Sequence, residues 1–160
     1  MPRIEQSLTN LAQARYITSM DVLKGFHQIK VSPDSRKPLR IICHKGVYEY
    51  LRMPFGIKNA PSYFQSMMDS EFRNELTENW LLIYIDDIII FSETWEEDVD
   101  HISRVLKRVK DIGMTISLKK CHFGYQEIAA LGKIVSGLRI AVDQNKVAAV
   151  MLKPIPQNKQ

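Results

Sequence analysis

Residues 81–92 read Leu-Leu-Ile-Tyr-Ile-Asp-Asp-Ile-Ile-Ile-Phe-Ser, and this stretch decides the fold. Its apolar runs, 81–83 and 88–91, are too short for helices and rich in β-branched and aromatic residues, so they predict two strands joined by a tight turn. Asp86 and Asp87 then lie at the tip of a hairpin. Because neighbouring carboxylates repel each other, a hard cation such as Mg²⁺ or Mn²⁺ would stabilise them. Asp is also common in turns, where it stays solvated, so the pair alone leaves both interpretations open.

The composition indicates one globular domain. The chain has 160 residues, 45% of them hydrophobic, which is enough for one sizeable core. Lys and Arg exceed Asp and Glu by 22 to 18, a net charge of +4 that is compatible with a polyanionic partner without establishing one. Cys43 and Cys121 have no zinc-like spacing with histidine, and two cysteines alone make no disulfide framework, so we expect a reducing compartment. No apolar run has the length of a membrane span or of a signal-peptide core, so we expect a soluble intracellular protein.

Upstream of the hairpin, the sequence predicts a helix, a strand, a second hairpin and a second helix. Apolar spacing at 4–14 predicts a short amphipathic helix, and 16–20 predict a strand that ends at Asp21. Residues 41–43 and 47–51 predict a second hairpin around 44–46. Pro61 suits the first turn of a helix that we expect to run to about Leu76.

Downstream of the hairpin, Thr94 and Glu97 form a capping-box pattern for a helix that ends near Gly113. Its apolar stripe is expected at Val99, Ile102, Val105, Leu106, Val109 and Ile112. Residues 114–116, 128–131 and 133–135 predict short strands, and Asp143 can cap a last helix at 144–152. The order of elements predicts an α+β fold with helices on one side of a mainly antiparallel sheet.

A second element has to supply another carboxylate if the hairpin serves two-metal phosphoryl chemistry, because one hairpin cannot bracket both ions. Asp21 is the candidate, since it ends an apolar strand and precedes a sharp turn at Gly25. An ordinary strand-end Asp is the alternative interpretation from these residues alone.

Several consecutive segments carry a family resemblance. Residues 19–29 (SMDVLKGFHQI), 51–65 (LRMPFGIKNAPSYFQ), 84–92 (YIDDIIIFS), 119–123 (KKCHF) and 131–136 (LGKIVS) resemble, in order and spacing, motifs of gypsy-type LTR-retrotransposon reverse transcriptases. The resemblance extends from about 2 to 156. It implies an RNA-directed DNA polymerase with a right-hand polymerase palm: a ferredoxin-like antiparallel sheet backed by helices, with partial fingers and a truncated thumb. Within a reverse transcriptase domain at 1–160, the palm would cover about 15–140 and the thumb would begin at about 143–153.

The resemblance also implies site residues. The catalytic and metal-binding residues would be Asp21, Asp86 and Asp87, with two Mg²⁺ ions or Mn²⁺ as a substitute. The nucleotide-binding residues would be Val22, Gly25, Phe26, Phe55 and Gly56, with the Phe26 ring excluding a 2′-hydroxyl. The template and primer contacts would be Lys58, Asn59, Pro61, Phe64, Gln65, Tyr84, Leu131 and Gly132. Without the family, Phe26 is equally a core aromatic and Lys58 a solvated charge.

The implied partners are an RNA or DNA template with its primer, deoxynucleoside triphosphates, and the protease, RNase H and integrase of a Pol polyprotein, with no membrane. The implied location is the cytoplasm, inside a virus-like particle, or the nucleus, without secretion.

Parts of the sequence depart from the family pattern. The chain starts at what resembles the middle of the family domain, so we expect earlier finger strands to be missing. Residues 37–40 read Lys-Pro-Leu-Arg in place of Lys-Thr-Ala-Phe, and 130–133 read Ala-Leu-Gly-Lys in place of Phe-Leu-Gly-His. Two alternatives therefore stay open. One is a truncated, non-catalytic remnant that at most binds nucleic acid, and the other is an unrelated Mg²⁺ phosphotransfer module, for which a parallel α/β pattern would be expected.

Overall fold

The structure is a computed structural model that describes residues 14–130, 133–136 and 139–142. In chain order its elements are β1 (Tyr16–Asp21), α2 (Gly25–Gln28), α3 (Pro33–Arg36), η2 (Lys37–Leu39), β2 (Ile41–Cys43), β3 (Gly46–Tyr48), α4 (Ala60–Glu71), α5 (Arg73–Thr77), β4 (Leu81–Tyr84), β5 (Asp87–Ser92), α6 (Trp95–Asp111), η3 (Leu118–Lys120), β6 (His122–Tyr125), β7 (Glu127–Ala130), β8 (Lys133–Ser136) and β9 (Arg139–Val142). The predicted helix at 4–14 lies outside the described residues apart from Ala14. The predicted helix at 144–152 and the thumb at 143–153 lie outside them entirely.

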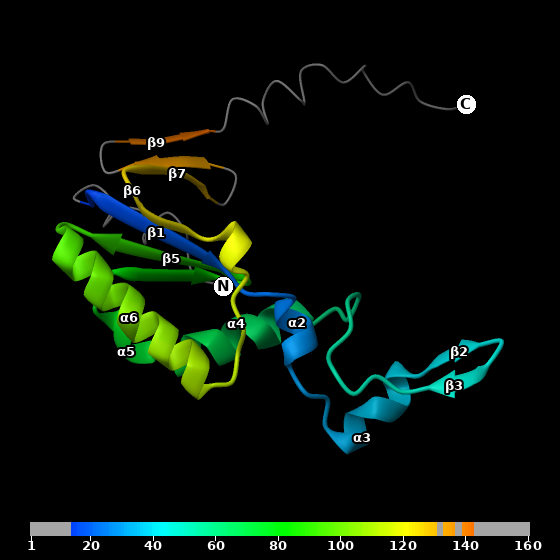
Figure 1. Cartoon of the computed structure of the whole chain (residues 1–160). Coiled ribbons are helices and arrows are strands. Elements are labelled where there is room, and N and C mark those ends of the chain that lie inside the picture. Colours follow the sequence, from blue (N-terminus) through cyan, green and yellow to red (C-terminus); the bar gives the residue numbers. More distant parts are fainter. Residues whose placement is uncertain (1–13, 131–132, 137–138, 143–160) are drawn as a thin grey trace, which may run out of the picture.

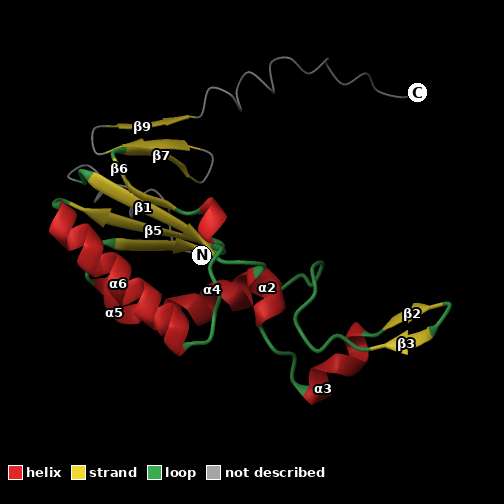
Figure 2. Cartoon of the chain, viewed as in Figure 1, coloured by secondary structure: helices red, strands yellow, loops and turns green. Residues whose placement is uncertain are grey.

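The central sheet has four strands in the order β4-β5-β1-β6. All its pairs are antiparallel, and the predicted hairpin at 81–92 is confirmed as β4 and β5. The helices α4, α5 and α6 lie together on one side of this sheet, while β7, β8 and β9 form a small separate sheet (Figures 1 and 2). The predicted α+β class with an antiparallel sheet is therefore confirmed for the described residues.

Alternate residues of the central strands enter two different cores. On β5, Ile88 and Ile90 pack in the larger core together with Phe64 and Phe72 from the helical layer. The intervening Ile89 packs in a second cluster with Ile17, Leu82, Phe91 and Ile128. Because side chains of a strand alternate between the two faces of a sheet, burial of both faces explains why 88–91 is continuously apolar.

The helix α6 begins and ends as the sequence predicts. Its N-cap Thr94 accepts from the backbone N–H of Glu97, whose side chain accepts in return from the Thr94 N–H, and Gly113 follows the helix with a φ of 70°. The predicted apolar stripe is only partly right. Val105 and Val109 are buried, but Val99 and Leu106 are 49% and 40% exposed, because the sheet covers a narrower face of the helix than the apolar spacing predicts.

Several predicted boundaries are wrong. The helix expected at 61–76 is broken at Phe72, which has φ −105° and ψ 23°, and the chain continues as the short α5. The strand expected at 114–116 is one isolated bridge between Val22 and Ile116. The strands β6 and β9 were not predicted from the sequence, since their short segments lack a clear alternation.

The hairpin of β2 and β3 projects away from the sheet and its helices (Figure 1). All six of its strand residues are exposed, and among the strands that the structure describes, its two strands pair with no others. The downstream strand ends at Tyr48, before the predicted end at Leu51. Among the described residues, no helix is both long and apolar enough to cross a membrane.

Candidate active site

Three aspartates meet at one end of the central sheet. In the antiparallel register of β1 and β5, Asp21 lies directly opposite Asp87. The hairpin register pairs Tyr84 with Asp87, which leaves Ile85 and Asp86 as the two turn residues. The sequence placed both acids at the hairpin tip; in the structure Asp86 is in the turn and Asp87 begins the returning strand.

The turn has an unusual backbone conformation. Ile85 has a φ of 52°, a left-handed value that is rare for a β-branched residue and occurs where the surroundings hold it in place. One constraint comes from the β1 side of the turn, where the Val22 N–H donates to the Asp86 carbonyl oxygen at 2.8 Å. The predicted nucleotide-binding Val22 thus has a buried side chain, 1% exposed, and contacts the turn through its backbone.

The carboxylates at this end of the sheet perturb one another. Partial burial, followed by the charges of Asp21 and Asp87, raises the pKa of Asp86 above its usual range. Partial burial and Asp21 likewise raise the pKa of Asp87. Oδ1 of Asp86 is buried without a hydrogen-bond partner among the described residues. The ammonium of Lys120 lies 3.1 Å from Oδ2 of Asp21, and its positive charge acts in the opposite direction on both pKa values.

These residues fit a divalent cation by the chemistry of their donors. Hard carboxylate oxygens are the preferred ligands of Mg²⁺ and Mn²⁺, and a cation would satisfy the unpartnered oxygen of Asp86 and offset the repulsion that raises its pKa. Within the described ranges, no three His, Cys, Asp or Glu side chains already stand close enough together to enclose an ion. By donor chemistry and by their place at this end of the sheet, Asp21, Asp86 and Asp87 are the residues that would hold the ion.

Gly25 gives the Asp86 carboxylate its space. A Cβ built on Gly25 would overlap Oδ1 of Asp86 and lie 2.8 Å from Cζ of Phe64. Next to it, Phe26 makes edge-to-face contacts with Phe55 and Phe64, with ring centroids 5.6 and 5.5 Å apart. The structure thus brings the predicted nucleotide-site residues Gly25, Phe26 and Phe55 into one cluster, in which Gly25 lies against Asp86.

Other predicted nucleic-acid contacts lie around α4. Lys58, Asn59 and Gly56 are exposed in the loop before the helix, and Pro61 is half-buried in its first turn. Their predicted contacts stay predictions.

Two predicted template residues are buried. Phe64 is 0% and Gln65 is 2% exposed, and Tyr84 is half-buried beside the turn. Their predicted contacts with the template stay predictions. Leu131 and Gly132 lie outside the described residues.

Two contacts of this site were not predicted from the sequence. Lys120 stood out only as part of a motif, and its contact with Asp21 joins positions 99 residues apart. The Gln65 side-chain amide contacts Ile83 of β4 and Ile85 of the turn, in addition to the template contact that stays a prediction. Neither contact has a local sequence signal, because both depend on packing between distant segments.

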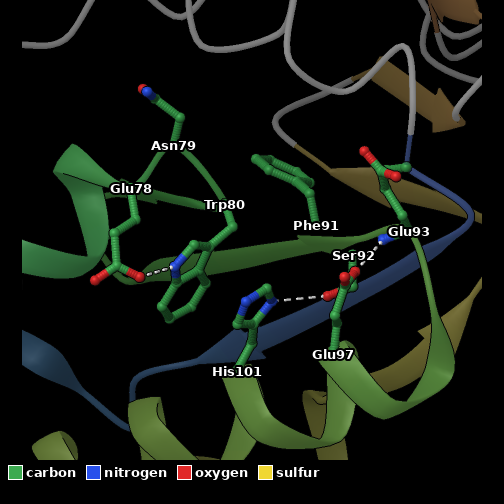
Figure 3. Close-up of a pocket in the computed structure, with 9 residues that line it drawn as sticks. Glu78, Asn79, Trp80, Phe91, Ser92, Glu93, Glu97 and His101 are labelled. Atoms are coloured by element: carbon green, nitrogen blue, oxygen red, sulfur yellow. Dashed lines mark hydrogen bonds between the residues drawn. The ribbon is translucent and has the colours of Figure 1, made fainter.

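A separate pocket lies at the opposite end of the hairpin, where β4 begins and β5 ends. It is a cavity of about 460 Å³ lined by Ala14, Glu78, Asn79, Trp80, Phe91, Ser92, Glu93, Glu97 and His101 (Figure 3). The His101 ring stacks on Trp80 with centroids 4.0 Å apart. Hydrogen bonds from Arg104 and Trp80 lower the pKa of Glu78 to about 2, so this carboxylate is already well paired.

The Ser92, His101 and Asp98 side chains in this region do not form a nucleophilic triad. Ser92 Oγ is buried and donates to Oδ1 of Asp98 at 3.2 Å, so in its contact with Nδ1 of His101 at 3.0 Å the hydroxyl oxygen accepts. Asp98 also accepts from Thr18 Oγ1 at 2.9 Å and orients no imidazole. The network ties α6 to the sheet, and burial together with the charge of Arg104 lowers the pKa of His101.

Comparisons with known proteins agree with this geometry. A family model described as "Reverse transcriptase (RNA-dependent DNA polymerase)" matches residues 1–135. The Pol polyprotein from transposon 297 of Drosophila melanogaster is 38% identical over 156 residues, which are 98% of this chain and 15% of that polyprotein. The Pol polyprotein from transposon gypsy of the same species is 37% identical with the same coverage, and a Tf2-3 polyprotein of Schizosaccharomyces pombe is 31% identical over 100% of this chain and 12% of its own length.

Solved structures show the same fold. The foamy viral protease-reverse transcriptase in complex with RNA/DNA hybrid matches with a TM-score of 0.82 and 23% identity over 94% of this chain and 20% of its own. Its complex with double-stranded DNA matches with a TM-score of 0.86 and 22% identity over 98% and 27%. At this identity the likeness confirms the polymerase fold class alone. The chain spans only about 15% of the length of the Drosophila polyproteins that it matches.

Proposed function

Because the chain belongs to the reverse transcriptase (RNA-dependent DNA polymerase) family, we propose that it is the palm region of a gypsy-type retrotransposon reverse transcriptase and adds deoxynucleotides to a primer 3′-hydroxyl. The observation that carries this proposal is the antiparallel register that sets Asp21 against Asp87, with Asp86 in the adjoining turn. Acids from two strands at one end of a sheet can supply carboxylate ligands from both sides to a pair of metal ions, as two-metal phosphoryl transfer uses.

Each aspartate has a distinct setting in this proposal. Asp86 supplies a buried oxygen that has no partner among the described residues, and Asp21 supplies a carboxylate that forms an ion pair with the Lys120 ammonium. Two divalent ions, Mg²⁺ or Mn²⁺, would activate the 3′-hydroxyl and stabilise the leaving pyrophosphate when bound. Asp87 adds a further carboxylate beside them, at the start of β5 and opposite Asp21.

The aromatic residues next to the acids would shape the nucleotide site. Phe26 is held edge-on between Phe55 and Phe64, which restricts the position of its ring. A ring fixed there is suited to exclude a 2′-hydroxyl by steric contact. Phe55 is 65% exposed and would be covered by the incoming nucleotide.

We further propose an RNA or DNA template with its primer as partner, together with the protease, RNase H and integrase of a Pol polyprotein. The Drosophila relatives are Pol polyproteins, and the two structural neighbours described above are complexes with RNA/DNA hybrid or double-stranded DNA. We propose that the protein works in the cytoplasm, inside a virus-like particle, or in the nucleus. Its two free cysteines, Cys43 and Cys121, are compatible with a reducing compartment.

Primer extension tests the proposal. The chain is incubated with poly(rA)/oligo(dT), deoxythymidine triphosphate and Mg²⁺ or Mn²⁺, beside Asp86→Asn and the control Asp34→Asn, an exposed acid of α3. We expect extension by the unchanged chain and by the control, and none by Asp86→Asn. Extension that survives in Asp86→Asn contradicts the proposed role of the acids. Template binding without extension by any of the three chains favours the non-catalytic alternative.

A further inference from the structure

The buried amide of Gln65 is directed at the turn that carries Asp86. Its Oε1 accepts from the backbone N–H of Ile85 at 2.8 Å, and its Nε2 donates to the Ile83 carbonyl oxygen at 3.0 Å. The second N–H of the amide donates to Oδ1 of Asp69, one turn further along α4, at 2.8 Å. With 2% exposure, this side chain has almost no access to solvent, and both its oxygen and its nitrogen are engaged in these contacts.

The contacts of Gln65 with Ile83 and Ile85 pair backbone groups at an open edge of the sheet. Among the described strands β4 is the outer one of the central sheet, so alternate backbone groups along it have no partner from another described strand. Ile83 and Ile85 are two residues apart and present a carbonyl and an N–H on that edge, which is the pattern that a neighbouring strand would meet. A primary amide offers a donor and an acceptor side by side in this way. Gln65 thus takes the place of a fifth strand at one point.

This contact lies where the backbone is strained. Ile85 holds a φ of 52° although its side chain is β-branched. The turn is held from two sides, by Gln65 on the Ile85 N–H and by the Val22 N–H on the Asp86 carbonyl oxygen. Because Asp86 follows Ile85 directly, relaxation of Ile85 toward an extended conformation would rotate the Asp86 carboxylate away from Asp21.

We propose that Gln65 is a positioning residue that holds Ile85 in its left-handed conformation and thereby directs the Asp86 carboxylate toward the metal-binding side of the sheet. The catalytic consequence of this inference rests on the proposed polymerase function. The restraint that Gln65 places on Ile85 is independent of that function. The direct template contact expected for Gln65 from the sequence is a different role, since it would need an exposed side chain.

The test compares Gln65→Met with the matched control Asp69→Asn. Methionine has a similar length and no amide, so it removes both contacts with the turn, whereas asparagine keeps an acceptor oxygen for Gln65 and does not touch the turn. Hydrogen exchange of the Ile85 amide, followed by NMR, is expected to be roughly five to ten times faster in Gln65→Met, as for loss of one intramolecular hydrogen bond. Exchange of β1 amides and all rates in Asp69→Asn are expected to stay as in the unchanged chain.

Two further measurements address the consequence for Asp86. Titration with Mn²⁺ followed by electron paramagnetic resonance should give an apparent Kd raised about three- to tenfold in Gln65→Met, a loss of the same size as the hydrogen bond. Primer extension should show a lower kcat with an unchanged KM for the primer–template. Gln65→Leu, which likewise lacks the amide, should give the same changes in exchange and Mn²⁺ affinity, and it serves in place of Gln65→Met if that variant does not fold.

The outcomes separate this inference from the proposed function. An unchanged Ile85 exchange rate in Gln65→Met, or equal acceleration across the whole sheet, would overturn the positioning role in favour of simple packing. Faster Ile85 exchange with unchanged Mn²⁺ affinity would overturn the link to Asp86. If the unchanged chain does not extend primers, the proposed function of this chain fails, while exchange and Mn²⁺ binding still decide the role of Gln65.

Discussion

Gly25→Ala should damage both stability and catalysis through one added methyl group. Gly25 is buried, and its backbone is not in the left-handed region, so alanine meets no conformational penalty there. The cost is steric. The new Cβ would overlap Oδ1 of Asp86 and lie 2.8 Å from Cζ and 2.9 Å from Cε2 of Phe64, closer than side-chain carbons approach. Phe64 is fully buried and packed edge-on against Phe26, so it cannot swing away.

The magnitude follows from which neighbour moves. Forcing one methyl into a packed core typically costs about 1–3 kcal/mol, and urea unfolding followed by tryptophan fluorescence should show a loss in this range. Displacement of the Asp86 carboxylate by about 1 Å should lower the rate of primer extension by about a hundredfold. Stability and catalysis are therefore expected to fall together.

Gly46→Ala is the control for the glycine-to-alanine change itself. Gly46 has a φ of 131°, and no atom lies within 4 Å of the position that the alanine methyl would take, so the cost is backbone strain confined to the projecting hairpin of β2 and β3. We expect the cooperative unfolding of the sheet to be unchanged in this variant. A Gly25→Ala chain with the stability and extension rate of the unchanged protein would refute the close approach of Asp86 to α2.

Three further predictions concern charge and capping. Burial and the charge of Asp21 raise the pKa of Asp86, so the folded chain binds the carboxyl proton more tightly than the unfolded chain, and stability falls as pH rises above about 4. In the absence of metal, Asp86→Asn should therefore melt at a higher temperature than the unchanged chain at pH 7. This difference in melting temperature should disappear below about pH 4. Burial lowers the pKa of His101, so the folded state favours the neutral ring and the free energy of unfolding should fall as pH drops below about 6.5. Urea unfolding from pH 5 to 8 should show that the free energy of unfolding depends less on pH in His101→Gln than in the unchanged chain. Thr94→Ala removes the N-cap of α6 and should cost about 1 kcal/mol of unfolding free energy, with a loss near zero contradicting the observed capping box.

The strands and caps that the sequence predicted well are those with strong local signals. The runs at 81–83 and 88–91, the strand before Asp21 and the Thr94 capping box each depend on residues within a few positions of one another, and each is confirmed. The break at Phe72 and the single bridge at Ile116 were missed because packing against the sheet, and not helical or strand periodicity, decides where those elements stop.

By itself, the sequence determined the hairpin with its two acids, the strand that ends at Asp21, and the family, because these are properties of residue order and local spacing. Only the tertiary structure decided the opposition of Asp21 and Asp87, the placement of the Lys120 ammonium 3.1 Å from Asp21, and the amide of Gln65 beneath the turn. The physical reason is that strand register and side-chain burial are set by contacts between segments that are distant in the chain. Such contacts form only when the whole core packs, so no local pattern records them.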